Sequence, residues 1–231
     1  MQGGLQALLW YGAFVVSVSV HETAHAWAAW LGGDPTASQI GGRSLNPLPR
    51  IRREPFGMLI VPLLSALSYG WAIGWATTPY DPRWAARYPR RAAWMAAAGP
   101  AANGLLAGLS LAALHAGLAS GRFVAPQRIG LSRLVEGSGP LWDAVGVVLS
   151  ILLVLNVILG LFNLIPFPPL DGASALSLLL PTGPARALRE TLRNPWLAGG
   201  GLLAAWWLFA RGVGPIFSVV LRLVHPGLSY G

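Results

Sequence analysis

The stretch LQALLWYGAFVVSVSVHETAHAWAAWL, residues 5–31, decides how this chain folds. It is apolar along most of its length, and about 20 such residues are enough for a helix to cross a membrane. It lacks a basic start, so we do not interpret it as a cleaved signal peptide. Its second half nevertheless contains His21, Glu22 and His25. The stretch therefore predicts a membrane-spanning helix that carries ionisable groups.

The composition of the whole chain agrees with a membrane environment. Of the 231 residues, 54% are hydrophobic and only 10% are charged, whereas a soluble domain carries about 25% charged residues. We predict an all-α polytopic membrane protein with about five to six transmembrane helices, in which residues 1–231 form a single membrane domain. The helices are expected at approximately 5–31, 58–76, 92–118, 141–166 and 196–224.

The charges point to lipid as the polar partner. The net charge is +8, and all 16 basic residues are arginines. They lie mostly in short loops between apolar runs, where guanidinium groups contact lipid phosphates. We therefore expect the lipid bilayer, and no nucleic acid, as a partner. The absence of cysteine excludes disulfides, thiolate metal ligands and a cysteine nucleophile.

The first long loop contains a turn signal. Within residues 36–57, the pair Gly41-Gly42 separates two short segments, Thr36–Ile40 and Arg43–Asn46. A Gly-Gly pair in this position is typical of a β-hairpin. We therefore predict a short membrane-associated hairpin, which could offer an edge strand to an extended peptide.

The sequence His21-Glu22-Thr23-Ala24-His25 is an HExxH arrangement. On a helix, residues four apart lie on one face, about 6 Å apart along the axis, so both imidazoles can reach one metal ion. Glu22 points to an adjacent face, within reach of a metal-bound water. Such a pattern also occurs on ordinary polar helix faces, but here it lies in an apolar run, where an unpaired charge costs about 3 kcal/mol. The pattern predicts a zinc hydrolase site.

A catalytic zinc ion needs a third protein ligand and an open fourth position. The extended motif HExxHxxGxxH is excluded because Leu31 occupies the place of the third histidine. Glu54 is a conceivable ligand, but the two arginines before it favour an interfacial salt bridge. His115 and His225 lie near the ends of apolar runs, which favours an interfacial position.

Asp171 is the remaining candidate for the third ligand. It lies in the Pro-rich segment 166–172, where Pro166, Pro168 and Pro169 break the preceding helix. Such a break can turn a carboxylate inward, because non-helical backbone at membrane depth is tolerated only against protein or a wet cavity. The alternative for this segment is a turn at the protein surface.

With these motifs in place, the sequence resembles the site-2 protease family of intramembrane metalloproteases, in its compact prokaryotic form without PDZ or CBS modules. The matching stretches are His21–His25, Gly33–Ala37, Gly42-Arg43, Leu45–Leu48, Gly74–Ala76, Pro89-Arg90, Ala98–Asn103, Asn163–Pro166 and Pro169–Gly172. The resemblance implies one Zn²⁺ per chain, with His21, His25 and Asp171 as ligands. It further implies that Glu22 is the catalytic acid/base and that Asn163 helps to hold substrate or the oxyanion.

Two features of the matching stretches need comment. Thr77 stands where many relatives have a lysine after Gly-Trp-Ala, so a role that depends on that charge is not expected here. Asn103 and the pair Gly99-Pro100 have a plain structural interpretation, because small residues and asparagine favour close helix packing in lipid.

The resemblance implies an intramembrane zinc endopeptidase that hydrolyses peptide bonds in or near the transmembrane segments of single-pass membrane proteins. The expected location is a multi-pass position in a prokaryotic cell membrane. One alternative is an inactive relative that binds a membrane protein without cutting it, although such a protein has no need of Glu22. A metal transporter is a weaker alternative, because the chain has no obvious internal repeat and its intramembrane charges converge on one site.

Overall fold

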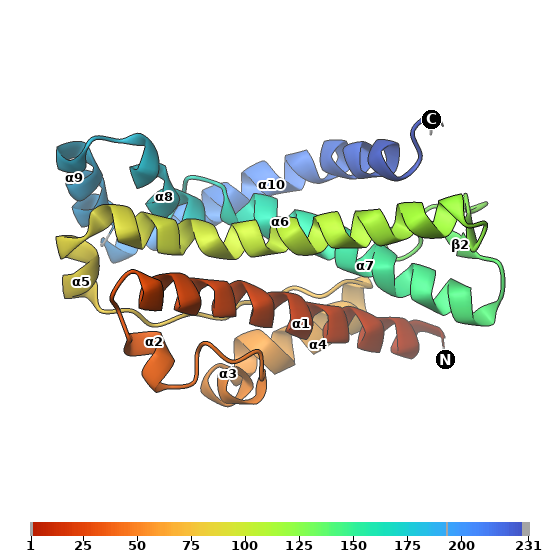
Figure 1. The fold of residues 1–231 in the computed structure, drawn as a ribbon, viewed down its shortest axis with the longest axis horizontal. Helices are drawn as coiled ribbons and strands as arrows, with labels where there is room; N and C mark the ends of the chain where they lie inside the picture. Colours follow the sequence, from red (N-terminus) through yellow and green to blue (C-terminus); the bar gives the residue numbers. More distant parts are fainter. Residues whose placement is uncertain (1, 193, 228–231) are drawn as a thin grey trace.

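The chain folds into a bundle of helices, as a computed structural model of residues 2–192 and 194–227 shows (Figure 1). Within these residues, four helices of 24 to 31 residues are apolar enough to cross a membrane. They are α1 (Gln2–Leu31), α6 (Pro89–Ala119), α7 (Pro140–Asn163) and α10 (Pro195–Val224). The all-α fold class is therefore confirmed.

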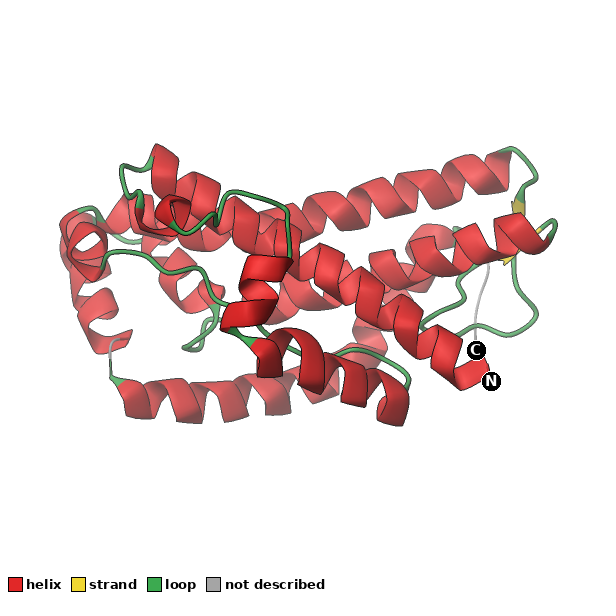
Figure 2. Cartoon of the chain, turned by 90° about the horizontal axis from the view of Figure 1, so that it is seen from below, coloured by secondary structure: helices red, strands yellow, loops and turns green. Residues whose placement is uncertain are grey.

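Shorter elements connect the four long helices. The first connection holds α2 (Thr36–Gln39), α3 (Leu48–Arg53), the π-helix η1 (Phe56–Ile60), α4 (Val61–Tyr69) and α5 (Pro82–Arg87). Strands β1 (Phe123–Val124) and β2 (Glu136–Gly137) pair antiparallel between α6 and α7. The last connection holds α8 (Asp171–Ala175), the 3₁₀ helix η2 (Leu176–Leu179) and α9 (Thr182–Leu192). Figure 2 shows that helices account for most of the chain.

The hairpin predicted within residues 36–57 is wrong. These residues form α2 and α3, and the glycine pair ends α2 instead of turning a hairpin. Gly41 has a positive φ of 74°, the Gly42 amide donates to the Ala37 carbonyl at 2.8 Å, and the Gly41 amide donates to the Ser38 carbonyl at 3.1 Å. This is the Schellman arrangement, in which two residues after a helix bond back to its last turn. The same two residues can thus signal a helix end or a hairpin.

The second apolar run is shorter as a helix than predicted. The helix expected over 58–76 ends at Tyr69, where Gly70 follows with a φ of 78°. Residues 71–81 then run without regular secondary structure toward α5, and in Figure 1 this connection passes alongside α1. The 14 residues Phe56–Tyr69 therefore form a shorter apolar helix beside the four long ones.

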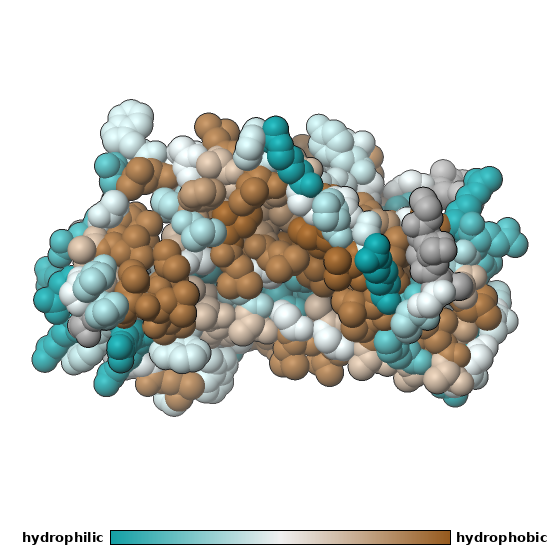
Figure 3. Space-filling model, turned by 90° about the horizontal axis from the view of Figure 1, so that it is seen from above, coloured by the Kyte–Doolittle hydropathy of each residue, from teal (hydrophilic) through white to brown (hydrophobic). Residues whose placement is uncertain are grey.

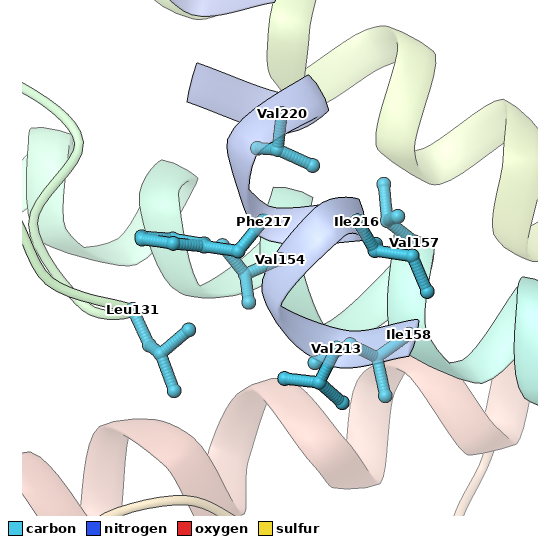
Figure 4. A pocket seen from close by; sticks show the side chains of 8 residues that line it. All are labelled: Leu131, Val154, Val157, Ile158, Val213, Ile216, Phe217 and Val220. Atoms are coloured by element: carbon cyan, nitrogen blue, oxygen red, sulfur yellow. The ribbon is translucent and has the colours of Figure 1, made fainter. Parts of the chain in front are cut away.

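The core lies where α1, α6 and α7 meet. Four large side chains here are fully buried and belong to one hydrophobic cluster: Trp10 and Phe14 of α1, Leu114 of α6 and Ile151 of α7. Helix α10 packs on this group, with the Phe162 and Phe209 rings 5.2 Å apart between centroids. Farther along, a narrow gap between α7 and α10 is lined only by apolar side chains, as Figure 4 shows. The three-helix core thus fixes α1, which carries the HExxH motif.

The surface of the bundle suits lipid. Large apolar side chains such as Leu105 (65% exposed) and Leu203 (75% exposed) point outward from the long helices. Figure 3 shows apolar side chains over much of one face, with hydrophilic ones mostly toward its ends. A soluble monomer rarely exposes an apolar surface of this extent.

The break predicted at 166–172 is present. Helix α7 ends at Asn163, residues 164–170 are turns and bends, and α8 begins at Asp171. Gly172 makes this turn possible, because a Cβ atom there would lie 2.2 Å from the Leu164 carbonyl oxygen. The turn returns the chain so that the first residue of α8 faces α1.

Candidate metal centre

The side chains of His21, His25 and Asp171 meet at one point, although Asp171 lies 146 positions after His25 in the chain. The Asp171 Oδ2 atom lies 3.1 Å from His21 Nε2 and 3.3 Å from His25 Nε2. The two Nε2 atoms are 2.9 Å apart, and both histidines are buried. A tetrahedral zinc ion with bonds of about 2.0 Å has its ligand atoms about 3.3 Å apart. The triangle formed by the three atoms therefore has the size that such an ion requires.

The outer nitrogen of each imidazole is occupied. His25 Nδ1 lies 2.7 Å from the Met95 carbonyl oxygen, and His21 Nδ1 lies 2.6 Å from Asn103 Oδ1. A carbonyl oxygen can only accept, so His25 carries its proton on Nδ1. In the neutral imidazole, this leaves the His25 Nε2 lone pair facing Asp171.

The tautomer of His21 follows from a chain of asparagines. Asn156 Nδ2 donates to the Leu152 carbonyl, which fixes the orientation of the Asn156 amide. Asn156 Oδ1 therefore accepts from Asn103 Nδ2 at 2.8 Å, and Asn103 Oδ1 accepts from His21 Nδ1. The His21 Nε2 atom consequently also offers a lone pair. With both imidazoles neutral, two nitrogen lone pairs and a carboxylate face one another, an arrangement that needs a metal cation or a shared proton between them.

Gly99 of α6 packs against both imidazole rings. A Cβ atom at this position would lie 2.3 Å from His25 Nε2 and 2.6 Å from His21 Nε2. A glycine is thus the residue that leaves space for the two ligand nitrogens. The purely structural interpretation of Gly99 and Asn103 from sequence missed these contacts, since they depend on how α1 and α6 pack.

Glu22 of α1 is buried, with 4% of its surface exposed, and directly follows His21 in the chain. Its Oε2 atom accepts a hydrogen bond of 2.5 Å from the Thr78 hydroxyl. Thr78 belongs to the irregular segment 71–81, which passes α1 at this point. The expected acid/base role of Glu22 stays a prediction, and Thr78 is a contact that the sequence did not reveal.

Arg50 fixes the loop next to the motif. Its buried guanidinium donates to the carbonyls of Gly42 and Ser44 and to the Thr23 hydroxyl, which lies one residue after Glu22. Burial lowers the pKa of Arg50, while the charge of Glu22 acts in the opposite direction. Arg50 thereby connects residues 42–44, which follow α2, with Thr23 of α1.

The other candidates take different positions. Asn163 donates to the Leu159 carbonyl of its own helix, and among the described residues no hydrogen bond links it to the converging histidines or Asp171. Its expected role therefore stays a prediction. Glu54 pairs with Arg53 at 3.5 Å and accepts from Thr77 at 2.7 Å, which agrees with a salt bridge. His225 is buried at the end of α10 and bonds to the Leu134 carbonyl, and its expected interfacial position stays a prediction.

Comparison with known proteins identifies the family. The model of peptidase family M50 matches residues 10–205, a range that includes the HExxH motif and Asp171. A protein of Bacillus subtilis (strain 168), named "Putative zinc metalloprotease YwhC", is 33% identical over 172 residues, which are 73% of this chain and 68% of that protein. No solved structure matches. The chain belongs to peptidase family M50, the site-2 protease family, and is an integral membrane metalloprotease.

Proposed function

We propose that this protein is an intramembrane zinc endopeptidase that cuts single-pass membrane proteins in or near their transmembrane segments. The observation that carries the proposal is the position of His21 and His25 within α1, a helix long and apolar enough to cross a membrane. With α1 centred on the bilayer, a rise of 1.5 Å per residue puts His21 about 7 Å from the midplane, inside a hydrocarbon layer that extends about 15 Å to each side. A site at this depth is accessible to a peptide bond inside the bilayer.

In this proposal, His21, His25 and Asp171 hold one zinc ion through Nε2, Nε2 and Oδ2. When bound, the zinc ion lowers the pKa of a coordinated water to about 7 and polarises the peptide carbonyl. The fit rests on the spacing of the three atoms and on the lone pairs that both imidazoles present. Asn103 and Met95 hold the rings in that orientation.

Glu22 acts as the general acid/base. It takes a proton from the attacking water and later passes it to the amine of the leaving peptide. Asn163 assists by holding substrate or the oxyanion, since its bond to Leu159 uses one of its two amide hydrogens.

A helical substrate must unwind before cleavage, because its carbonyls are engaged in its own hydrogen bonds. The segment leading to Thr78 supports an extended binding mode. The amides of Ile73, Trp75 and Thr77 donate to Ser65, Gly57 and Glu54 respectively, all on one side. Since alternate residues of an extended chain point to opposite sides, the intervening residues direct their amides and carbonyls to the other side. That side is the proposed edge for a substrate strand.

The proposal is tested with a Glu22→Gln variant and a co-expressed single-pass membrane substrate. We expect this variant to bind zinc normally and to lose cleavage, whereas Glu190→Gln, at an exposed position on α9, retains both. Cleavage that survives Glu22→Gln would rule out the mechanism. An inactive relative would show no cleavage in the wild-type protein, and a transporter would move metal ions in vesicles.

The Glu22→Gln variant also serves to identify substrates. Because it retains the binding site without the acid/base, membrane proteins trapped by it in the prokaryotic cell membrane can be co-purified and identified by mass spectrometry. Proteins trapped by this variant, and absent when Asp171→Asn is used, are the expected substrates.

A further inference from the structure

We propose that Thr78 is a positioning residue that holds the Glu22 carboxylate in its working orientation, an inference that rests on the proposed function. The Thr78 Oγ1 atom lies 2.5 Å from Glu22 Oε2 and 3.0 Å from the Glu22 backbone carbonyl. Both contacts connect residues 56 positions apart in the chain. Among the described residues, no other side chain forms a hydrogen bond with the Glu22 carboxylate.

Hydrogen bonds fix the segment that carries Thr78 on both sides of this residue. Before Thr78, the backbone amide of Thr77 donates to Glu54 Oε1 at 3.0 Å, a bond that does not depend on the Thr77 side chain. After it, the Asp81 amide donates to the buried carboxylate of Asp34 at 2.8 Å. These anchors leave Thr78 little freedom to move away from Glu22. Its hydroxyl is therefore a fixed donor instead of a surface group that happens to be near.

The geometry leaves one carboxylate oxygen for chemistry. The Thr78 hydroxyl has a single hydrogen, and the shorter of its two contacts directs that hydrogen to Oε2. Charge-assisted hydrogen bonds of this kind are among the stronger ones in proteins. With Oε2 held, the rotation of the carboxylate is restricted, and Oε1 remains to accept the proton of the attacking water. The Thr78 side chain thus acts through Glu22.

The neighbouring threonine provides a matched control. Thr77 has the same side chain, but its hydroxyl bonds to Glu54 instead of Glu22. Substituting each threonine by valine removes a hydroxyl at nearly constant volume. Thr78→Val removes the hydroxyl that bonds to Glu22, whereas Thr77→Val removes the hydroxyl that bonds to Glu54.

The experiment measures kcat, KM and zinc content of Thr78→Val, Thr78→Ser and Thr77→Val in the full-length protein. Displacing a catalytic group by about 1 Å can lower the rate by about 100-fold. We therefore expect Thr78→Val to lower kcat by about 10- to 100-fold, with KM and zinc content unchanged. Thr78→Ser should recover most of the rate, because it restores the hydroxyl, and Thr77→Val should resemble the wild type.

Three results would overturn the inference: an unchanged kcat in Thr78→Val, a loss of zinc or of folded protein in that variant, or a Thr78→Ser variant that is equally slow. These results are distinct from failure of the proposed function. If Glu22→Gln is inactive while Thr78→Val is fully active, the inference alone is wrong. If Glu22→Gln still cleaves, the proposed function fails and the inference with it.

Discussion

Gly99→Ala should abolish tight zinc binding although it adds a single methyl group. The new Cβ would lie 2.3 Å from His25 Nε2 and 2.6 Å from His21 Nε2, whereas ordinary contacts begin at 3.4 Å. The rings must therefore move by about 1 Å, while zinc–ligand distances tolerate about 0.2 Å. The rings cannot turn away freely, because each Nδ1 atom is bonded, His21 to Asn103 and His25 to Met95.

The expected loss of zinc affinity is larger than the loss caused by changing a residue that only supports a ligand. Changing a residue that only supports a ligand lowers metal affinity by about 10- to 100-fold. Gly99→Ala displaces two ligands directly, so we expect a loss of more than about 100-fold. Alanine in a helix interior is favoured over glycine by about 1 kcal/mol, so helix α6 itself should not be destabilised by the change. A lower zinc affinity in this variant would therefore be caused by displacement of the two histidine ligands and not by a less stable helix.

The assay is a competition for zinc between the purified protein and a chromophoric chelator. Gly104→Ala and Gly108→Ala are the matched controls, because they make the same change in the same helix at positions with no atom within 4 Å of the new Cβ. Both should bind zinc as the wild type does. Wild-type affinity in Gly99→Ala would refute the arrangement of α1 against α6 described above.

Three further substitutions test neighbouring parts of the site. Asn156→Leu removes the amide that orients Asn103 and should lower zinc affinity by about 10- to 100-fold; an unchanged affinity in the chelator competition would contradict the asparagine chain. Gly172→Ala places a Cβ 2.2 Å from the Leu164 carbonyl oxygen, so zinc content and thermal stability in detergent should both fall; normal values would show that the turn before Asp171 is looser than described. Asn163→Ala should lower kcat with zinc retained, and full activity would remove Asn163 from the mechanism.

The local patterns of the sequence predicted the helices and two of the three converging residues. The spacing of His21 and His25 determines that both lie on one helix face, so their meeting needs no knowledge of the fold. Asp171 is different. The prolines before it predicted the break in the helix, but the direction in which the chain returns depends on Gly172 fitting under Leu164. From the residues alone Asp171 was the remaining candidate for the third ligand, with a surface turn as the alternative, and the family resemblance implied the ligand role.

The contacts that complete the site could not be read from one sequence. Asn103 lies 82 residues from His21, and Thr78 lies 56 residues from Glu22. Which asparagine or threonine meets a given residue depends on how the helices and loops pack. The predicted hairpin failed for a local reason, because Gly41-Gly42 can close a Schellman helix end as readily as a turn between strands. A positive φ, which Gly41 adopts here and which glycine tolerates, occurs in both structures.

The most direct test of the central claim is X-ray absorption spectroscopy at the zinc edge on purified, zinc-loaded protein, with Asp171→Asn and His25→Ala for comparison. We expect one zinc ion per chain, with two imidazole nitrogens at about 2.0 Å and the remaining ligands oxygen. Each variant should change this spectrum or lose the metal. Protein that takes up no zinc, or a spectrum that is the same in the wild type and both variants, would contradict a metal centre built from α1 and α8.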